Sequence, residues 1–266
     1  MAATVMSAMN VTPPWAGAAL TGPGATAFAL VVVAYCVLGE PFVGRWLHRA
    51  MERDVREDPL RRWRGYARLV VLEVVLGGVA LVVAAALSGI GLHRLGLGLP
   101  RAGGSGFLFG AGIGVSAGAV LAVVASTVAI WQLDRPIPVV GGNRVRIMVP
   151  TRPAERVWFL TLSIAAGICE ELLFRGVLLA LLAALLHGPS PWLVVLLGAA
   201  AFGAAHAYQG AGGMLVTGVL GAILGAVYLT TGSLLLAMVL HALIDARVGL
   251  LPARALGGTA PAEAPT

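Results

Sequence analysis

Lysine is absent from this chain of 266 residues, and charged residues of all kinds make up only 11% of it. Soluble domains average about 25% charged residues, so the composition argues against a soluble protein. All eighteen basic residues are arginines, and the net charge is +6. Because these arginines gather between apolar runs, their charge does not indicate nucleic-acid binding, and we expect no nucleic-acid partner.

Cysteine is equally scarce. Cys36 and Cys169 both lie within apolar runs, which favours buried free thiols over a disulfide. The first 24 residues carry no charge, so the basic start of a signal peptide is missing. Residues 257–266 are rich in glycine, alanine and proline, which predicts a disordered end.

Long apolar runs dominate what is present. Apolar residues make up 59% of the chain, and its mean hydropathy is +0.91. Several runs approach the roughly 20 residues that a helix needs to cross a bilayer. We therefore predict an all-α, polytopic transmembrane helical bundle with about seven spans, and the N-terminal stretch leaves room for an eighth. The expected spans are residues 24–38, 67–92, 105–130, 157–186, 192–207, 213–230 and 233–251.

Arginines are unevenly distributed among the connecting segments. Most lie in residues 45–68 and 135–156, whereas only Arg94 and Arg101 lie between the second and third spans. Arginine-rich loops stay in the cytoplasm. We therefore expect a multi-pass protein of the cytoplasmic membrane. An N-terminal segment (1–23) would lie outside, followed by the membrane domain (24–251) and a disordered cytoplasmic tail (252–266).

Small residues recur every four positions in two of the expected spans. Gly110, Gly114 and Gly118 do so in the third, and Gly221 and Gly225 in the sixth. This spacing predicts close helix packing. Glu73, in the second span, lies about two turns from the arginine-rich segment, and we expect it to pair with an arginine there.

Glu170 and Glu171 stand in the middle of an apolar run. A carboxylate at membrane depth costs about 2.5–3.5 kcal/mol on insertion scales, so such residues are functional candidates. Glu171 precedes Arg175 by four residues, the favourable order for a helical ion pair. Glu170 lies about 100° round the helix from Glu171, which leaves it free to act as a base.

Three further polar residues lie at a similar depth in later spans. His206 ends the fifth, and His241 and Asp245 are one turn apart in the seventh. At 1.5 Å per residue, Glu170 lies about 10 Å and His241 about 12 Å from the cytoplasmic boundary. One site could therefore contain all of them. Singly, each histidine could instead be a helix–helix hydrogen-bond donor, the acidic pair an interhelical ionic lock, and Asp245 an interfacial charge.

Three motifs in this order resemble the CAAX protease and bacteriocin-processing (Abi) family of intramembrane proteases, which includes the type II CAAX prenyl endopeptidases. The motifs here are Glu170-Glu171-x-x-x-Arg175, Phe202-x-x-x-His206 and His241-x-x-x-Asp245. The resemblance covers residues 157–250, the expected catalytic core. Residues 1–150 carry no matching motif.

The resemblance implies peptide-bond hydrolysis within the membrane, on a prenylated CAAX tail in the eukaryotic members. It implies that Glu170 is the general base, that His206 holds the water, and that His241 and Asp245 stabilise the oxyanion. Glu171, Arg175 and Phe202 would organise the site. An ionised Asp245 cannot donate a hydrogen bond, so it could instead orient His241.

The cofactor and the function class stay open at this point. Zinc is possible, with Glu170, Glu171, His206 and His241 as candidate ligands, although the sequence has no His-Glu-x-x-His helix. Metal-free activation of water is an equal alternative. Expected partners are the lipid bilayer and a membrane-protein or lipidated peptide substrate. The rival functions are a non-enzymatic immunity or scaffold protein of the same fold and, with less support, a transporter.

Overall fold

A computed structural model of the chain describes residues 11–86, 95–102, 105–133, 135–137 and 141–256, and every regular element in these ranges is a helix. The all-α prediction is therefore confirmed. The elements are α2 (Gly22–Ala34), η1 (Tyr35–Gly39), α3 (Glu40–Glu57), η2 (Pro59–Arg61), α4 (Arg62–Ala86), α5 (Gly106–Trp131), α6 (Asn143–Arg146), α7 (Pro153–Glu170), η4 (Glu171–Leu178), α8 (Leu179–Leu185), α9 (Pro191–Ala205), η5 (Ala207–Gln209), α10 (Gly210–Thr231), α11 (Leu234–Leu250) and η6 (Ala253–Leu256).

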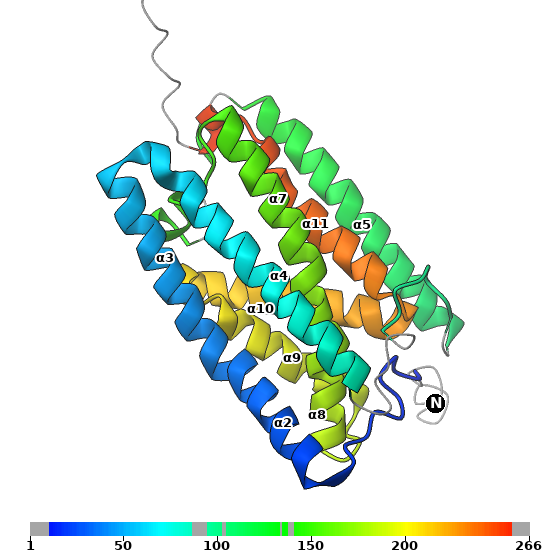
Figure 1. The fold of residues 1–266 in the computed structure, drawn as a ribbon. Helices are drawn as coiled ribbons and strands as arrows, with labels where there is room; N and C mark the ends of the chain where they lie inside the picture. The colour runs from blue at the N-terminus through cyan, green and yellow to red at the C-terminus, as the bar shows by residue number, and fades with distance from the viewer. Residues whose placement is uncertain (1–10, 87–94, 103–104, 134, 138–140, 257–266) are drawn as a thin grey trace, which may run out of the picture.

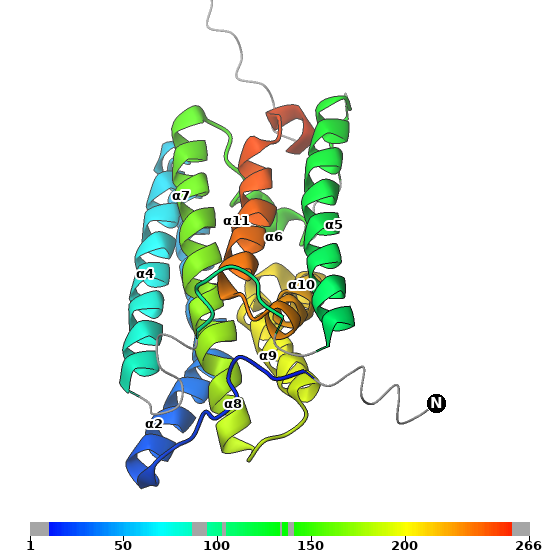
Figure 2. The same ribbon diagram turned by 90° about the vertical axis from the view of Figure 1, so that its right-hand side faces the viewer.

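Helix α7 occupies the middle of the bundle. It packs against α4 on one side and α11 on the other, and α11 in turn contacts α5. Figure 2 shows these four helices standing in a row. Helices α9 and α10 pack on each other behind this row, and α3 closes the bundle by contacting both α4 and α9 (Figure 1).

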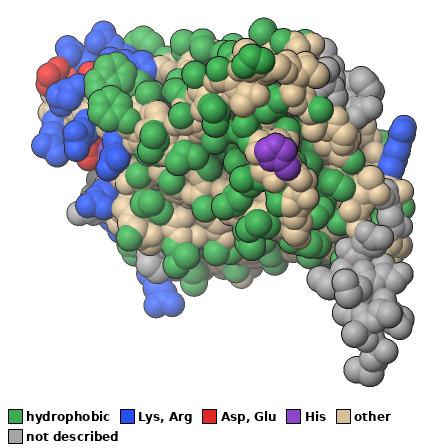
Figure 3. Space-filling model, turned by 90° about the horizontal axis from the view of Figure 1, so that it is seen from below, with side chains coloured by type: hydrophobic (Ala, Val, Ile, Leu, Met, Phe, Trp, Pro, Cys, Tyr) green, Lys and Arg blue, Asp and Glu red, His purple; other side chains and the backbone are tan. Residues whose placement is uncertain are grey.

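Membrane-spanning character is clear from helix length and composition. Four helical stretches are long and apolar enough to cross a membrane, namely Gly22–Glu57, Pro59–Ala86, Gly106–Trp131 and Ala207–Thr231. Pro191–Ala205 is apolar but shorter. Each of the seven expected spans coincides with a helix, although residues 87–92 of the second lie outside the described part. Figure 3 shows apolar side chains over much of one face, with most charged groups gathered at one edge and a basic side chain at the opposite edge.

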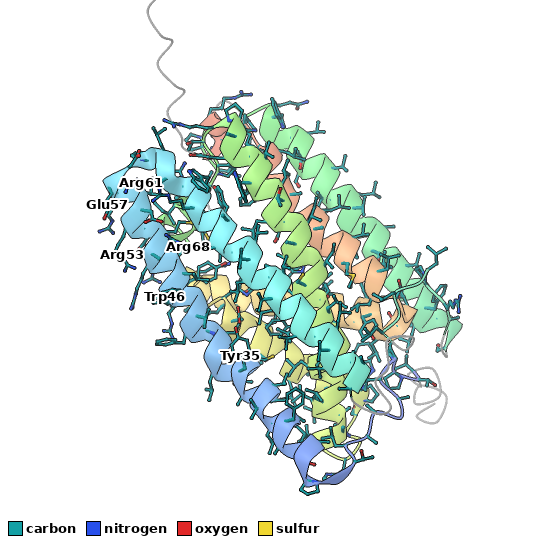
Figure 4. The ribbon with its side chains drawn as sticks, in the orientation of Figure 1. Tyr35, Trp46, Arg53, Glu57, Arg61 and Arg68 are labelled. Carbon is teal, nitrogen blue, oxygen red and sulfur yellow. The ribbon has the colours of Figure 1, made fainter. Side chains whose placement is uncertain are left out.

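One error in the sequence prediction concerns residues 45–68, which we expected to form a loop. They are helical, because α3 continues directly from α2 and η1, and α4 begins at Arg62. Leu47, Met51 and Val55 recur every four residues and are buried, while the arginines of α3 are exposed. Figure 4 shows the charged groups around the turn that joins α3 to α4.

The prediction of close helix packing is confirmed for one glycine repeat and wrong for the other. Side chains built at Gly110, Gly114 and Gly118 would meet nothing within 4 Å among the described residues, so this repeat mediates no helix contact there. In the sixth span the prediction holds, because a Cβ at Gly225 would lie 2.9 Å from Val195 Cγ1. Helix α5 instead makes its close approach through Gly112, against Thr230.

The two ends of the chain are described in part. Residues 1–10 of the N-terminal segment and 257–266 of the tail lie outside the described residues. The tail prediction was wrong at its start, because Ala253–Leu256 form η6 and Ala255 is fully buried. Cys36 and Cys169 are buried free thiols, as expected.

Candidate active site

A stretch of π-helix, Glu171–Leu178, follows directly on α7 and carries the first motif. Such segments are rare and often occur at functional sites. Here Glu171 and Arg175 remain on one face, with Nη1 of Arg175 2.8 Å from Oε1 of Glu171. The side chains are 3% and 0% exposed, so this is a fully buried ion pair. The pair predicted from the sequence is confirmed.

Glu171 also reaches a partner that the spacing alone did not predict. Its Oε1 accepts a hydrogen bond of 2.8 Å from Nδ1 of His241 on α11. Glu171 therefore joins Arg175 to His241 across two helices. Because Nδ1 is occupied, Nε2 is the ring nitrogen of His241 that is left for other partners.

The remaining nitrogen of His241 faces two acidic groups. Nε2 lies 3.9 Å from Oε2 of Glu170 and 3.6 Å from Oδ2 of Asp245. Both separations exceed a normal hydrogen bond, so Nε2 is not committed to either carboxylate. The hydrogen-bonded support of His241 thus comes from Glu171, while Asp245 lies beside its other ring nitrogen.

His206 lies where α9 ends. Its Nδ1 is 2.9 Å from the carbonyl oxygen of Phe202, one turn earlier, and a carbonyl can only accept. His206 therefore donates from Nδ1, which leaves Nε2 as the nitrogen available to a ligand.

Phe202 links the two halves of the site. The guanidinium of Arg175 lies 4.1 Å from the centre of the Phe202 ring. The same ring is 4.8 Å from the ring of His206 and 5.9 Å from that of His241. Phe202 is 1% exposed, so it fixes all three neighbours through packing.

Close packing of α4 and α11 against α7 places Glu170 between these helices. A Cβ at Gly167 would lie 2.8 Å from Ala242 on α11, and one at Gly77 on α4 would lie 2.6 Å from Sγ of Cys169. These two glycines bring α11 and α4 against α7 on either side of Glu170.

All the polar residues of the three motifs except Glu171 and Arg175 line one cavity of about 260 Å³. Glu170, His206, His241 and Asp245 contribute to its wall, together with Phe202. Oε2 of Glu170 is buried and has no hydrogen-bond partner among the described residues. The four predicted catalytic residues therefore surround one space that can hold water and part of a substrate.

Two further acidic residues line the same cavity, and neither was assigned to the site from the sequence. They are Glu40, at the start of α3, and Glu73, on α4. The expected pairing of Glu73 with an arginine is wrong, because the side chain is 6% exposed and forms no ion pair with any described arginine. The position of a carboxylate inside an apolar run is the sequence signal that could have assigned such a residue to the site.

The segment before α7 covers part of the cavity. Val145, Met148 and Val149 of this segment line the cavity, and we call residues 144–149 the cover. Side chains of α3 and α4 form hydrogen bonds with the backbone of the cover. Nε2 of His48 donates to the carbonyl of Arg144 (2.7 Å), Nε of Arg62 to that of Ile147 (3.1 Å), and the Tyr66 hydroxyl to that of Met148 (2.8 Å).

The fit of a metal can be tested on the donor set. Among the residues that the structure describes, no three His, Cys, Asp or Glu side chains gather in a way that could hold a metal ion. The four candidate ligands thus do not form a zinc site as they stand, and we derive no step through a metal.

Comparison with protein families gives one match. Residues 152–247 match the family described as type II CAAX prenyl endopeptidase Rce1-like. This confirms the resemblance of the three motifs, all of which lie within the matched segment. No curated protein and no solved structure matches the chain.

Proposed function

We propose, from the Rce1-like domain of residues 152–247, that the protein is an intramembrane endopeptidase acting on membrane-associated substrates. One observation carries the proposal. Glu170, His206 and His241, from three separate helices, contribute to the wall of a single buried cavity. A carboxylate and two imidazoles around a space that admits water can activate that water and stabilise an oxyanion.

The first step is attack by water on the substrate carbonyl carbon. Glu170 accepts one proton of the water as the new C–O bond forms. Nε2 of His206 can accept a hydrogen bond from the other proton of the water, because the ring proton lies on Nδ1, which donates to the Phe202 carbonyl. The water is thus held by two acceptors.

The negative charge develops on the former carbonyl oxygen. In its cationic form, His241 can donate from Nε2 to this oxyanion. The carboxylate of Glu171 on Nδ1 supports that form and fixes the ring. In the second step the C–N bond breaks, and Glu170 returns its proton to the leaving amine. The products are a carboxylic acid and an amine.

Asp245 takes part only indirectly in this scheme. An ionised carboxylate cannot donate to an oxyanion. Its Oδ2 lies 3.6 Å from Nε2 of His241, close enough to stabilise the imidazolium electrostatically. We therefore assign Asp245 to the support of His241.

The substrate class follows from the wall of the cavity. Apart from the polar groups, it is lined by leucine, methionine and valine side chains, among them Leu47, Met51 and Leu69. Such a wall suits an apolar transmembrane segment or a peptide with a lipid chain. Both are presented by the lipid bilayer, which the spanning helices occupy.

The test uses the full chain reconstituted in lipid vesicles. Quenched fluorescent peptides with and without a farnesyl group, and a single-span membrane protein, serve as substrates. Glu170→Gln, His206→Ala and His241→Ala should each lower kcat/KM by at least about a hundredfold. Glu57→Gln and His187→Asn, at exposed positions outside the site, are the matched controls.

Cleavage that persists in all three site variants would show that another group performs the chemistry. Absence of cleavage by the wild type on every substrate, with folding intact, would favour the non-enzymatic immunity or scaffold function. Vesicles also report ion flux, so transport is tested on the same preparation.

A further inference from the structure

Two carboxylates in the cavity have no role in the scheme above. Glu73, on α4, is 6% exposed, and Glu40 begins α3. Both line the cavity, and in each the Oε2 oxygen is buried and has no hydrogen-bond partner among the described residues. Leaving a buried acceptor unsatisfied costs about 1–3 kcal/mol, and more if it is charged. Such groups call for a partner.

Helix contacts place both groups next to the catalytic residues. Gly77 touches Cys169, so Glu73, one turn earlier on α4, stands beside Glu170. A Cβ at Gly44 would lie 3.4 Å from the carbonyl oxygen of Ala205, so Glu40, one turn before Gly44, lies near the end of α9 that carries His206. Glu73 interacts electrostatically with both Glu170 and Glu40, and its side chain also shares a hydrogen bond with Glu170.

The charge of the cavity is unbalanced. Its acidic lining residues are Glu40, Glu73, Glu170 and Asp245. Its described lining contains no arginine, and its basic residues are the histidines His48, His206 and His241. The chain has no lysine at all. Arg175, the nearest buried guanidinium, is engaged by Glu171. His241 interacts electrostatically with Glu73, and His206 does so with Glu40, but neither histidine forms an ion pair with these two carboxylates in the described part of the chain.

Like charges around a space of low dielectric repel one another, and a cation placed among them relieves that repulsion. The volume of about 260 Å³ exceeds that of a single water several times over, so it can hold a long side chain and part of a backbone.

We propose that Glu40 and Glu73 form a subsite for a cationic group of the substrate, an ammonium or a guanidinium, beside the scissile bond. The inference rests on the proposed protease function and adds a substrate class to it. Glu73 is the main ligand because it is the more deeply buried, and Glu40 is the second. The ammonium can come from a lysine side chain or from a free peptide N-terminus.

The experiment compares matched peptides in the vesicle assay. One position near the scissile bond carries lysine, arginine or norleucine, and each peptide is made with a free and an acetylated N-terminus. For the wild type, kcat/KM should be at least about tenfold higher for lysine or arginine than for norleucine, mainly through KM. Acetylation should remove the preference only if the N-terminus supplies the cation.

Variants then locate the preference. Glu73→Gln should bring the lysine-to-norleucine ratio close to one, and Glu40→Gln should reduce it in part. Glu57→Gln, on the exposed surface, should keep the wild-type ratio. Because both peptides are measured on the same variant, any loss of folded protein cancels. A wild type that shows no preference, or a Glu73→Gln variant that keeps it, would overturn the subsite.

A binding experiment tests this inference independently of the proposed function. Fluorescent lysine and norleucine peptides are titrated onto Glu170→Gln and onto Glu170→Gln/Glu73→Gln. Preference for lysine in the first variant and none in the second supports the subsite even if no peptide is ever cleaved. Equal binding of the two peptides by Glu170→Gln refutes it, even if the wild type is a protease.

Discussion

The two adjacent glutamates should differ sharply in what they do for stability. Glu171 is fully buried and has both Arg175 and His241 at 2.8 Å. Replacing it by glutamine leaves the guanidinium of Arg175 buried without its counter-charge, and breaking a buried pair costs about 3–5 kcal/mol. Glu170 forms its only ion pair among the described residues with His241, at 3.9 Å, so Glu170→Gln should cost less than about 1 kcal/mol.

The activities should follow a different pattern. Glu170→Gln should remove hydrolysis with little loss of stability, because the base is lost but no close ion pair is. Glu171→Gln should lower both. A third variant, Glu171→Gln/Arg175→Met, removes both charges and fills the space over Phe202. It should be more stable than the sum of the single changes predicts, with a coupling energy of at least about 2 kcal/mol.

The free energy of unfolding is measured for each variant in lipid bicelles by steric trapping, alongside vesicle kinetics. Glu57→Gln, whose ion pair with Arg61 is exposed, is the control and should change stability by less than about 0.5 kcal/mol. Equal unfolding free energies for Glu170→Gln and Glu171→Gln would refute the buried-pair assignment. So would a double variant without coupling.

Three further results are expected. Asp245→Asn should not lower kcat/KM below that of the wild type, since an amide can donate to the oxyanion, whereas Asp245→Leu should lower it at least about tenfold by leaving His241 without that charge. Chelators should leave the activity of the reconstituted protein unchanged, and a loss that zinc reverses would contradict the metal-free scheme. Gly112→Ala should cost about 1–3 kcal/mol of unfolding free energy, since its Cβ would collide with Thr230, while Gly114→Ala, which faces open space, should be neutral or slightly stabilising.

The sequence predicts what depends on local chemistry. The long apolar runs were sufficient to predict where the helices lie, because a helix satisfies its own backbone hydrogen bonds in lipid. The i,i+4 spacing of Glu171 and Arg175 was sufficient to predict their ion pair, and three motifs were sufficient to predict the family. These features depend on residues close in sequence or on a pattern that is already distinctive.

Features that depend on how helices face one another were missed. Average hydropathy concealed α3, because its arginines outweigh the buried stripe that includes Leu47 and Met51. The bond from His241 to Glu171 joins residues seventy positions apart, and no spacing rule reports it. The position of Glu73 depends on the contact of Gly77 with Cys169, which turns that face of α4 toward the cavity instead of toward the arginine-rich end.

The cover formed by the segment before α7 has a mechanical consequence. A polypeptide that reaches the cavity past Val145 and Met148 must displace the backbone of the cover. That backbone accepts hydrogen bonds from His48 on α3 and from Arg62 and Tyr66 on α4. Each such hydrogen bond contributes about 1 kcal/mol net, so their release sets a threshold of about 3 kcal/mol. If the proposed function holds, polypeptides whose binding does not offset this cost are excluded before hydrolysis, and the cover contributes to the choice of substrate.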